Sequence, residues 1–248
     1  MLEEDRNLPP TLSDWQRNAL FLDFDGTLAP IVPRPEDAAA SADTCRAVAR
    51  IAELAGGAVA ILSGRDLVDL DRRLGPLNLP AAGSHGAVRR DASGRMHRTE
   101  ISTAELARAV TLLEQFAKAR DLLVEHKTGA VTVHYRNRPE QADPARKLVD
   151  AITADAPALR AIHGNMVSEI ATRSANKGHA LQEFMGEPPF AGRVPVMVGD
   201  DTTDEDAFRM AAALGGVGLK IGAGETAATY RVSEIGDFLD WLHRSAAP

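Results

Sequence analysis

The sequence predicts an α/β fold, a doubly wound parallel-sheet core with an inserted α+β cap domain. Short apolar runs alternate with helical patterns at both ends of the chain, as a parallel sheet requires. The middle of the chain carries paired strand patterns joined by short turns, which are typical of an antiparallel sheet. We therefore expect core residues 1–88, an inserted cap domain at 89–173, and core residues 174–248.

The first part of the core reads as three strands separated by two helices. The apolar run at 20–22 enters Asp23-Phe24-Asp25-Gly26, which predicts a buried strand that ends at a sharp turn. The run at 58–62 leads into Ser63 in the same way, and helical patterns surround it. The expected order is a strand at 20–22, a helix at 43–55, a strand at 58–62, a helix at 66–74 and a strand at 79–82.

The predicted cap domain begins with two strands, 87–90 and 96–99, around a turn-forming segment. A second hairpin crosses Thr128-Gly129, and each hairpin is followed by a segment with helical spacing of apolar residues. The remaining expected elements are a helix from about 103, strands at 122–127 and 130–136, a helix at 139–156, and strands at 159–163 and 166–171.

The second hairpin has one polar face. A turn at Thr128-Gly129 sets Lys127 opposite Ala130 and Glu125 opposite Thr132. Alternation then places both charged residues on one face, and we expect that face to include Thr132, His134 and Arg136. Such a face suits either solvent or the hydroxyl groups of a ligand, and the pattern alone does not choose.

After the insertion the alternating pattern returns. We expect a helix at 177–185, a strand at 194–198, a helix at 205–214, strands at 217–221 and 231–233, and a last helix at 234–243.

Composition limits the possible partners. A net charge of −7 and a pI near 5.5 argue against nucleic acid or an anionic membrane as the main partner. Cys45 is the single cysteine, so no internal disulfide forms, and the start of the chain lacks the pattern of a signal peptide. We expect a cytoplasmic monomer that acts on a small molecule.

Four polar motifs follow predicted core strands or begin a core helix. The first pairs Asp23 with Asp25, and taken alone it is as compatible with a polar turn as with a cation site and a nucleophile. The second is Ser63, which follows the next strand. The third is Lys177 at a helix start, where a cation is disfavoured unless it has an anionic partner. The fourth is Asp200-Asp201, directly after an apolar strand.

The ordered set of these four motifs resembles the haloacid dehalogenase-like phosphotransferases. The resemblance implies that Asp23 attacks phosphorus to form an aspartyl-phosphate and that Asp25 acts as acid and then as base. It also implies that Ser63 and Lys177 hold the phosphoryl oxygens. The implied cofactor is Mg²⁺, and its implied metal-site residues are Asp23, Asp25 through its carbonyl, and Asp200, supported by Asp201 and Asp204.

Within that superfamily the chain resembles the trehalose-6-phosphate phosphatases, through segments that include His85, Glu125-His126-Lys127, His134-Tyr135-Arg136 and Glu169-Ile170. The resemblance implies trehalose 6-phosphate as substrate and a trehalose-phosphate synthase as a possible partner of this chain. The implied sugar contacts are Glu125, Lys127, Arg136 and Glu169, with Arg65 and His85 as further candidates.

Three other interpretations stay open at this point. One is another sugar-phosphate phosphatase of the superfamily, and a second is a phosphomannomutase-like phosphotransferase. The third is a non-catalytic regulatory partner of a trehalose-synthesising complex.

Overall fold

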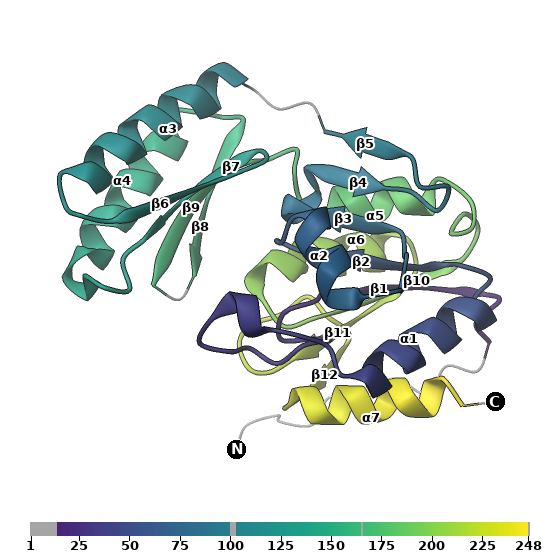
Figure 1. Cartoon of the computed structure of the whole chain (residues 1–248). Helices are drawn as coiled ribbons and strands as arrows, with labels where there is room; N and C mark the ends of the chain where they lie inside the picture. The colour runs from purple at the N-terminus through teal and green to yellow at the C-terminus, as the bar shows by residue number, and fades with distance from the viewer. Residues whose placement is uncertain (1–13, 100–102, 165, 248) are drawn as a thin grey trace. The chain divides into compact units, whose positions relative to one another are not determined.

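The computed structural model describes residues 14–99, 103–164 and 166–247, and the chain forms two compact units (Figure 1). The first unit comprises the chain up to His97 and from Asn176 onward, and the second comprises Arg98–Ala175. Among the described residues, no helix is both long and apolar enough to cross a membrane.

The first unit is built on an eight-stranded sheet in the order β12-β11-β10-β1-β2-β3-β4-β5. The six strands from β12 to β3 are parallel, which confirms the predicted α/β core. They are β1 (Asn18–Leu22), β2 (Val59–Leu62), β3 (Ala81–Gly83), β10 (Val194–Gly199), β11 (Val217–Ile221) and β12 (Tyr230–Val232).

Helices cover both faces of this sheet, so its central strands are buried and almost entirely apolar. Helices α1 and α7 lie side by side on one face, while α5 and α6 pack together on the other (Figure 1). The helices are α1 (Ala42–Leu54), α2 (Leu67–Leu74), α5 (Lys177–Met185), α6 (Glu205–Ala213) and α7 (Ile235–Ser245). Short 3-10 helices occur at Pro35–Asp37, Ser84–Gly86 and Thr202–Asp204.

One expectation about the insertion is wrong. The hairpin of β4 (Val88–Arg90) and β5 (Met96–Arg98) extends the core sheet, whereas the predicted boundary at residue 89 assigned it to the cap domain. The chain reverses directly after β3, so that Val88 pairs with Gly83 in an antiparallel ladder. A hairpin pattern predicts a pair of strands, but it does not tell which sheet edge will accept that pair.

The second unit is an antiparallel sheet in the order β6-β7-β9-β8, covered on one face by α3 and α4 (Figure 1). Its apolar face packs Val131, Val133 and Tyr135 against those helices. The expected register of the hairpin is confirmed, because Lys127 lies opposite Ala130 and Glu125 lies opposite Thr132. The elements are α3 (Thr103–Lys118), β6 (Leu123–Lys127), β7 (Ala130–His134), a 3-10 helix (Pro139–Gln141), α4 (Ala142–Ala154), β8 (Leu159–Gly164) and β9 (Val167–Thr172).

Candidate active site

The first and the fourth of the predicted motifs meet where the core sheet changes direction. Strands β1 and β10 are parallel neighbours, and their following connections lead to opposite sides of the sheet. Open α/β sheets bind ligands at such a point, beyond the carboxyl ends of the strands. Asp23 follows β1 and Asp200 follows β10, and the Asp23 amide donates a hydrogen bond to the Val198 carbonyl at 2.9 Å.

Lys177 connects two carboxylates at this point. Its Nζ lies 2.8 Å from Asp23 Oδ1 and 2.7 Å from Asp204 Oδ1, and the residue is only 2% exposed. Lys177 is the first residue of α5, a helix that packs on β1 through Phe184 and Phe21, whose rings lie 6.1 Å apart. The packing of α5 therefore brings the predicted lysine to the predicted nucleophile.

Burial and mutual repulsion shift the pKa values of the carboxylates around Lys177. Burial, followed by repulsion from Asp204, raises the pKa of the Asp23 carboxyl well above its ordinary value, although Lys177 acts in the opposite direction. Burial and Asp204 likewise raise the pKa of Asp200 to about 6. Burial disfavours the charge of Lys177, but Asp204 and Asp23 outweigh it and raise the pKa of the ammonium. Additional positive charge would relieve the repulsion among these carboxylates.

The position of Asp200 depends on Gly26. Gly26 has a φ of +75°, and a Cβ added there would lie 2.1 Å from Asp200 Oδ2. Asp200 Oδ1 is buried and, within the described residues, has no hydrogen-bond partner. Asp23, Asp200 and Asp204 each offer an oxygen within 4.8 Å of the other two. Carboxylate oxygens and an orphaned acceptor fit a hard divalent cation such as Mg²⁺.

Asp204 and Asp201 also hold the loop that follows β10. The second oxygen of Asp204 accepts from the Asp201 amide at 3.0 Å, so both of its oxygens already have donors. The Asp201 carboxylate accepts from the hydroxyls of Thr202 and Thr203, each at 3.3 Å. Burial raises the pKa of Asp201, but donors led by the Thr202 amide outweigh it, and the net shift is downward. These contacts fit the supporting role expected for both residues.

The Asp25 carboxylate lies in a different arrangement, paired with Arg65. The guanidinium donates to both carboxylate oxygens at 2.6 Å, and to Asp69 at 2.6 Å as well. Its central carbon also lies 5.5 Å from the Phe24 ring centroid, and the side chain is only 12% exposed. Arg65, a further candidate for sugar contact, thus holds the predicted acid and base in one orientation, and its contact with a sugar stays a prediction.

Ser63 and His85 lie on neighbouring loops at the ends of β2 and β3. The Ser63 Oγ is buried and accepts from the Arg65 amide at 3.2 Å. The His85 amide donates to the Ser63 carbonyl at 2.9 Å, and its ring packs so closely on Gly64 that a Cβ there would lie 2.6 Å from Cε1. The left-handed backbone at His85, with a φ of +56°, permits this placement. The core therefore places its predicted site residues after the adjacent strands β10, β1, β2 and β3, except for Lys177, which begins α5.

The second unit gathers most of its predicted residues on the polar face of its sheet. Glu169 on β9 accepts from Lys127 at 2.9 Å and from the Thr132 hydroxyl at 2.6 Å. Glu125 accepts from His134 at 2.9 Å, which lowers the pKa of the carboxyl despite partial burial, and it lies 3.9 Å from Lys127. Thr132 and His134 thus belong to the same cluster, a role that strand alternation indicated although neither was predicted as a site residue.

Arg136 is placed differently from the expectation. Strand β7 ends at His134, so the alternation does not reach Arg136, which lies in the exposed turn beyond it.

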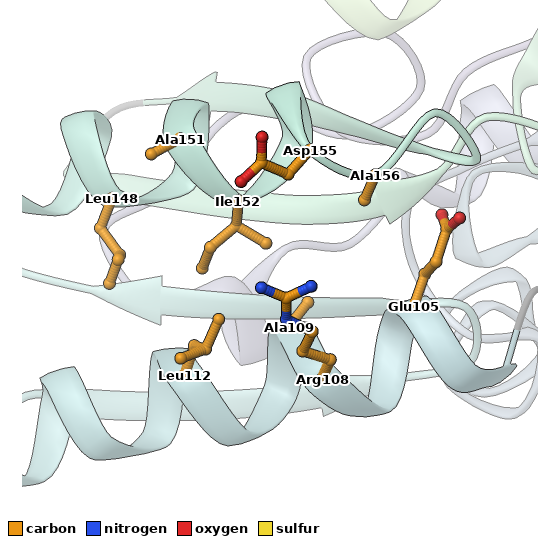
Figure 2. Close-up of a pocket in the computed structure, with 9 residues that line it drawn as sticks. All are labelled: Glu105, Arg108, Ala109, Leu112, Leu148, Ala151, Ile152, Asp155 and Ala156. Carbon is orange, nitrogen blue, oxygen red and sulfur yellow. The ribbon is translucent and has the colours of Figure 1, made fainter.

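A groove of about 240 Å³ in the second unit contains none of the predicted site residues (Figure 2). It lies between α3 and α4, where Leu112, Leu148 and Ile152 face one another and Arg108 projects between the helices (Figure 2). Its lining is mostly apolar, its charged residues are Glu105, Arg108 and Asp155, and it contains no lysine. The groove therefore does not compete with the core strand ends as a catalytic site.

Comparison with known proteins decides the family. Residues 21–235 match the family model described as trehalose-phosphatase. The chain belongs to the trehalose-phosphatase family. It is 38% identical over 229 residues to the trehalose-6-phosphate phosphatase of Escherichia coli, covering 90% of this chain and 85% of that protein.

Solved structures show the same fold. The C-terminal domain of the C. albicans trehalose-6-phosphate phosphatase has a TM-score of 0.80, with 22% identity over 93% of this chain and 92% of that chain. A haloacid dehalogenase-like hydrolase from B. subtilis has a TM-score of 0.61, with 17% identity over 82% of this chain and 89% of that chain. The chain is therefore a phosphatase with a haloacid dehalogenase-like fold.

Proposed function

We propose that this chain hydrolyses trehalose 6-phosphate to trehalose and inorganic phosphate, with Asp23 as the nucleophile and Mg²⁺ as the cofactor. The observation that carries the proposal is the buried Asp23 carboxylate, which lies 2.8 Å from Lys177 and beside the unpartnered oxygen of Asp200. A carboxylate in this setting can bind a cation and present an oxygen to phosphorus.

The residues present suit the cofactor. Asp23, Asp200 and the main-chain carbonyl of Asp25 would hold Mg²⁺, and Asp204 and Asp201 would fix the surrounding loop. When bound, the ion offsets the negative charge shared by the phosphate and the carboxylates.

The chain's own residues supply the rest of the reaction. Ser63 and Lys177 bind the phosphoryl oxygens, and an Asp23 oxygen forms a bond to phosphorus as the bond from phosphorus to the sugar oxygen breaks. Asp25 in its acid form gives its proton to that leaving oxygen. The resulting Asp25 carboxylate then takes a proton from a water molecule, which attacks phosphorus, releases phosphate and restores Asp23.

Recognition of the sugar is assigned to the polar face of the second unit. Glu125 and Glu169 would accept hydrogen bonds from sugar hydroxyls, while Lys127 would donate to sugar oxygens. Arg136 lies beyond this face, in the exposed turn after β7, and its sugar contact stays a prediction. The contacts among Glu125, Lys127 and Glu169 support this assignment, because they hold donors and acceptors in one cluster. His85 remains a further candidate for substrate contact, as predicted.

Phosphate release tests the proposal. The purified chain should release phosphate from trehalose 6-phosphate with Mg²⁺, lose turnover in chelator, and recover it on addition of Mg²⁺. Asp23→Asn should show no turnover while still unfolding in a single cooperative thermal transition. More than trace turnover by folded Asp23→Asn would contradict the nucleophile assignment.

The same assay separates the other interpretations. A phosphomannomutase-like enzyme would need a bisphosphate activator and would yield an isomer instead of phosphate. A regulatory module would turn over no sugar phosphate, yet such a module need not keep Asp23, Asp25, Lys177 and Asp200 together. The cytoplasmic location, the monomeric state and the association with a synthase stay predictions.

A further inference from the structure

Lys220 is a buried lysine that the proposed chemistry does not use. It is the fourth residue of β11 and lies opposite Gly199, the last residue of β10. The residue is only 4% exposed. A buried ammonium is costly unless it has a polar partner, so the contact it makes indicates what it does.

That contact is with the backbone of the proposed metal site. Lys220 Nζ donates a hydrogen bond to the main-chain carbonyl of Asp200, the first residue after β10. Because this bond is to the main-chain carbonyl, it does not occupy the carboxylate of Asp200. The carboxylate oxygen Oδ1 has no hydrogen-bond partner among the described residues. Lys177 differs, because its Nζ contacts the carboxylate oxygens of Asp23 and Asp204 directly. Lys220 thus brings positive charge to the site and leaves this ligand atom available.

Three contacts together fix Asp200. Lys220 holds its carbonyl, and the close approach of Gly26 limits where its carboxylate can lie. The Asp204 carboxylate accepts from the Asp201 amide at 3.0 Å and so fixes the next peptide. A ligand held in this way needs little rearrangement when a cation binds, which is how outer groups strengthen a metal site.

The charge of Lys220 also suits this place. With Asp23, Asp200 and Asp204 ionised, Lys177 balances only one of three buried or half-buried negative charges. A second ammonium beside Asp200 reduces the repulsion that remains, and it lowers the cost of keeping all three carboxylates ionised.

We propose that Lys220 is a positioning residue of the metal centre, which holds the Asp200 carbonyl so that the Asp200 carboxylate is aimed at the divalent cation. The inference rests on the proposed function, since that function supplies the need for a cation.

Calorimetric titration of Mn²⁺ into chelator-treated protein tests it, because Mn²⁺ takes the same oxygen ligands as Mg²⁺. Lys220→Met removes the donor and the charge and should raise the Mn²⁺ Kd by about tenfold or more, the scale of one hydrogen bond from a charged group. The Mg²⁺ concentration for half-maximal turnover should rise by a similar factor. Lys118→Met, at an exposed lysine of α3, is the control and should bind Mn²⁺ like the wild type.

The outcomes are distinct. An unchanged Mn²⁺ Kd in folded Lys220→Met overturns the proposal, and Lys220→Gln replaces that variant if it lacks a cooperative thermal transition. The Gln side chain is one bond shorter than that of Lys and carries no charge, so it should also weaken binding, and an unchanged Kd there also overturns the proposal. Wild-type protein that binds no Mn²⁺ contradicts both proposals. Wild-type protein that binds Mn²⁺ without hydrolysing any sugar phosphate contradicts the proposed function alone.

Discussion

Replacing Gly26 by alanine adds one methyl group where the loop after β1 meets the loop after β10. The new Cβ would lie 2.1 Å from Asp200 Oδ2 and 2.3 Å from its Cγ. Since non-bonded carbon and oxygen atoms keep at least about 3 Å apart, the carboxylate must move by about 1 Å. Displacements of that size at a reacting centre cost about a hundredfold in rate.

The same substitution also strains the backbone, because Gly26 has a φ of +75°. A left-handed conformation costs an alanine about 1 kcal/mol relative to glycine. Gly215→Ala is the matched control, since Gly215 has a φ of +78° and a Cβ there would meet no atom within 4 Å. Gly215→Ala should therefore lose about 1 kcal/mol of unfolding free energy in denaturant titrations, and Gly26→Ala should lose at least as much, because its methyl group also displaces Asp200.

Turnover distinguishes the two variants. Gly26→Ala should lose about a hundredfold in kcat/KM for trehalose 6-phosphate and should bind Mn²⁺ more weakly, while Gly215→Ala should keep both values near those of the wild type. Equal activity in the two variants would refute the account of Asp200, because the backbone strain alone would then explain every effect of the substitution.

Three further predictions concern single carboxylates. Asp25→Asn should still take the phosphoryl group from an aryl phosphate, because the leaving group of that substrate needs no acid. Without a base to activate water, the variant should retain the phosphoryl group on the peptide that contains Asp23. Mass spectrometry that finds no such adduct would count against Asp25 as the base. In chelator above pH 6, Asp200→Asn should be more stable to unfolding than the wild type by on the order of 2 kcal/mol, because the folded-state pKa of Asp200 is raised to about 6 and its ionisation destabilises the folded state. The difference should shrink as the pH falls from 6 to 4, and a constant difference in denaturant titrations would be inconsistent with the raised pKa. Glu169→Gln should lower kcat/KM for trehalose 6-phosphate at least about tenfold and should change kcat/KM for an aryl phosphate little. Equal losses on the two substrates would mean that Glu169 does not bind the sugar.

Much of the core site could be predicted because parallel strands bring their carboxyl ends to one edge. Asp23, Ser63 and Asp200 each follow an apolar run, so the order of elements alone placed them near one another. The register of the β6–β7 hairpin was predictable for a similar reason, since a two-residue turn leaves few ways to pair Lys127 with its partner.

Side-chain partners were harder to predict, because they depend on distances that no sequence pattern contains. Arg65 follows a strand end as a sugar contact would, yet its guanidinium is engaged by Asp25 and Asp69. The edge that receives β4 and β5 depends on a chain reversal after β3. The buried contact of Lys220 was indicated by the sequence, because a lysine inside the apolar strand Val217–Ile221 needs a polar partner.

Selectivity for the phosphate ester of one disaccharide separates this proposed function from that of a general sugar-phosphate phosphatase. The most direct measurement is kcat/KM for phosphate release, with Mg²⁺, from trehalose 6-phosphate, sucrose 6-phosphate, glucose 6-phosphate and mannose 6-phosphate. We expect kcat/KM for trehalose 6-phosphate to exceed the value for each other substrate by about a hundredfold or more, because buried polar groups reject substrates that leave them unpaired. Comparable values across the four substrates, or a preference for a monosaccharide phosphate, would contradict it.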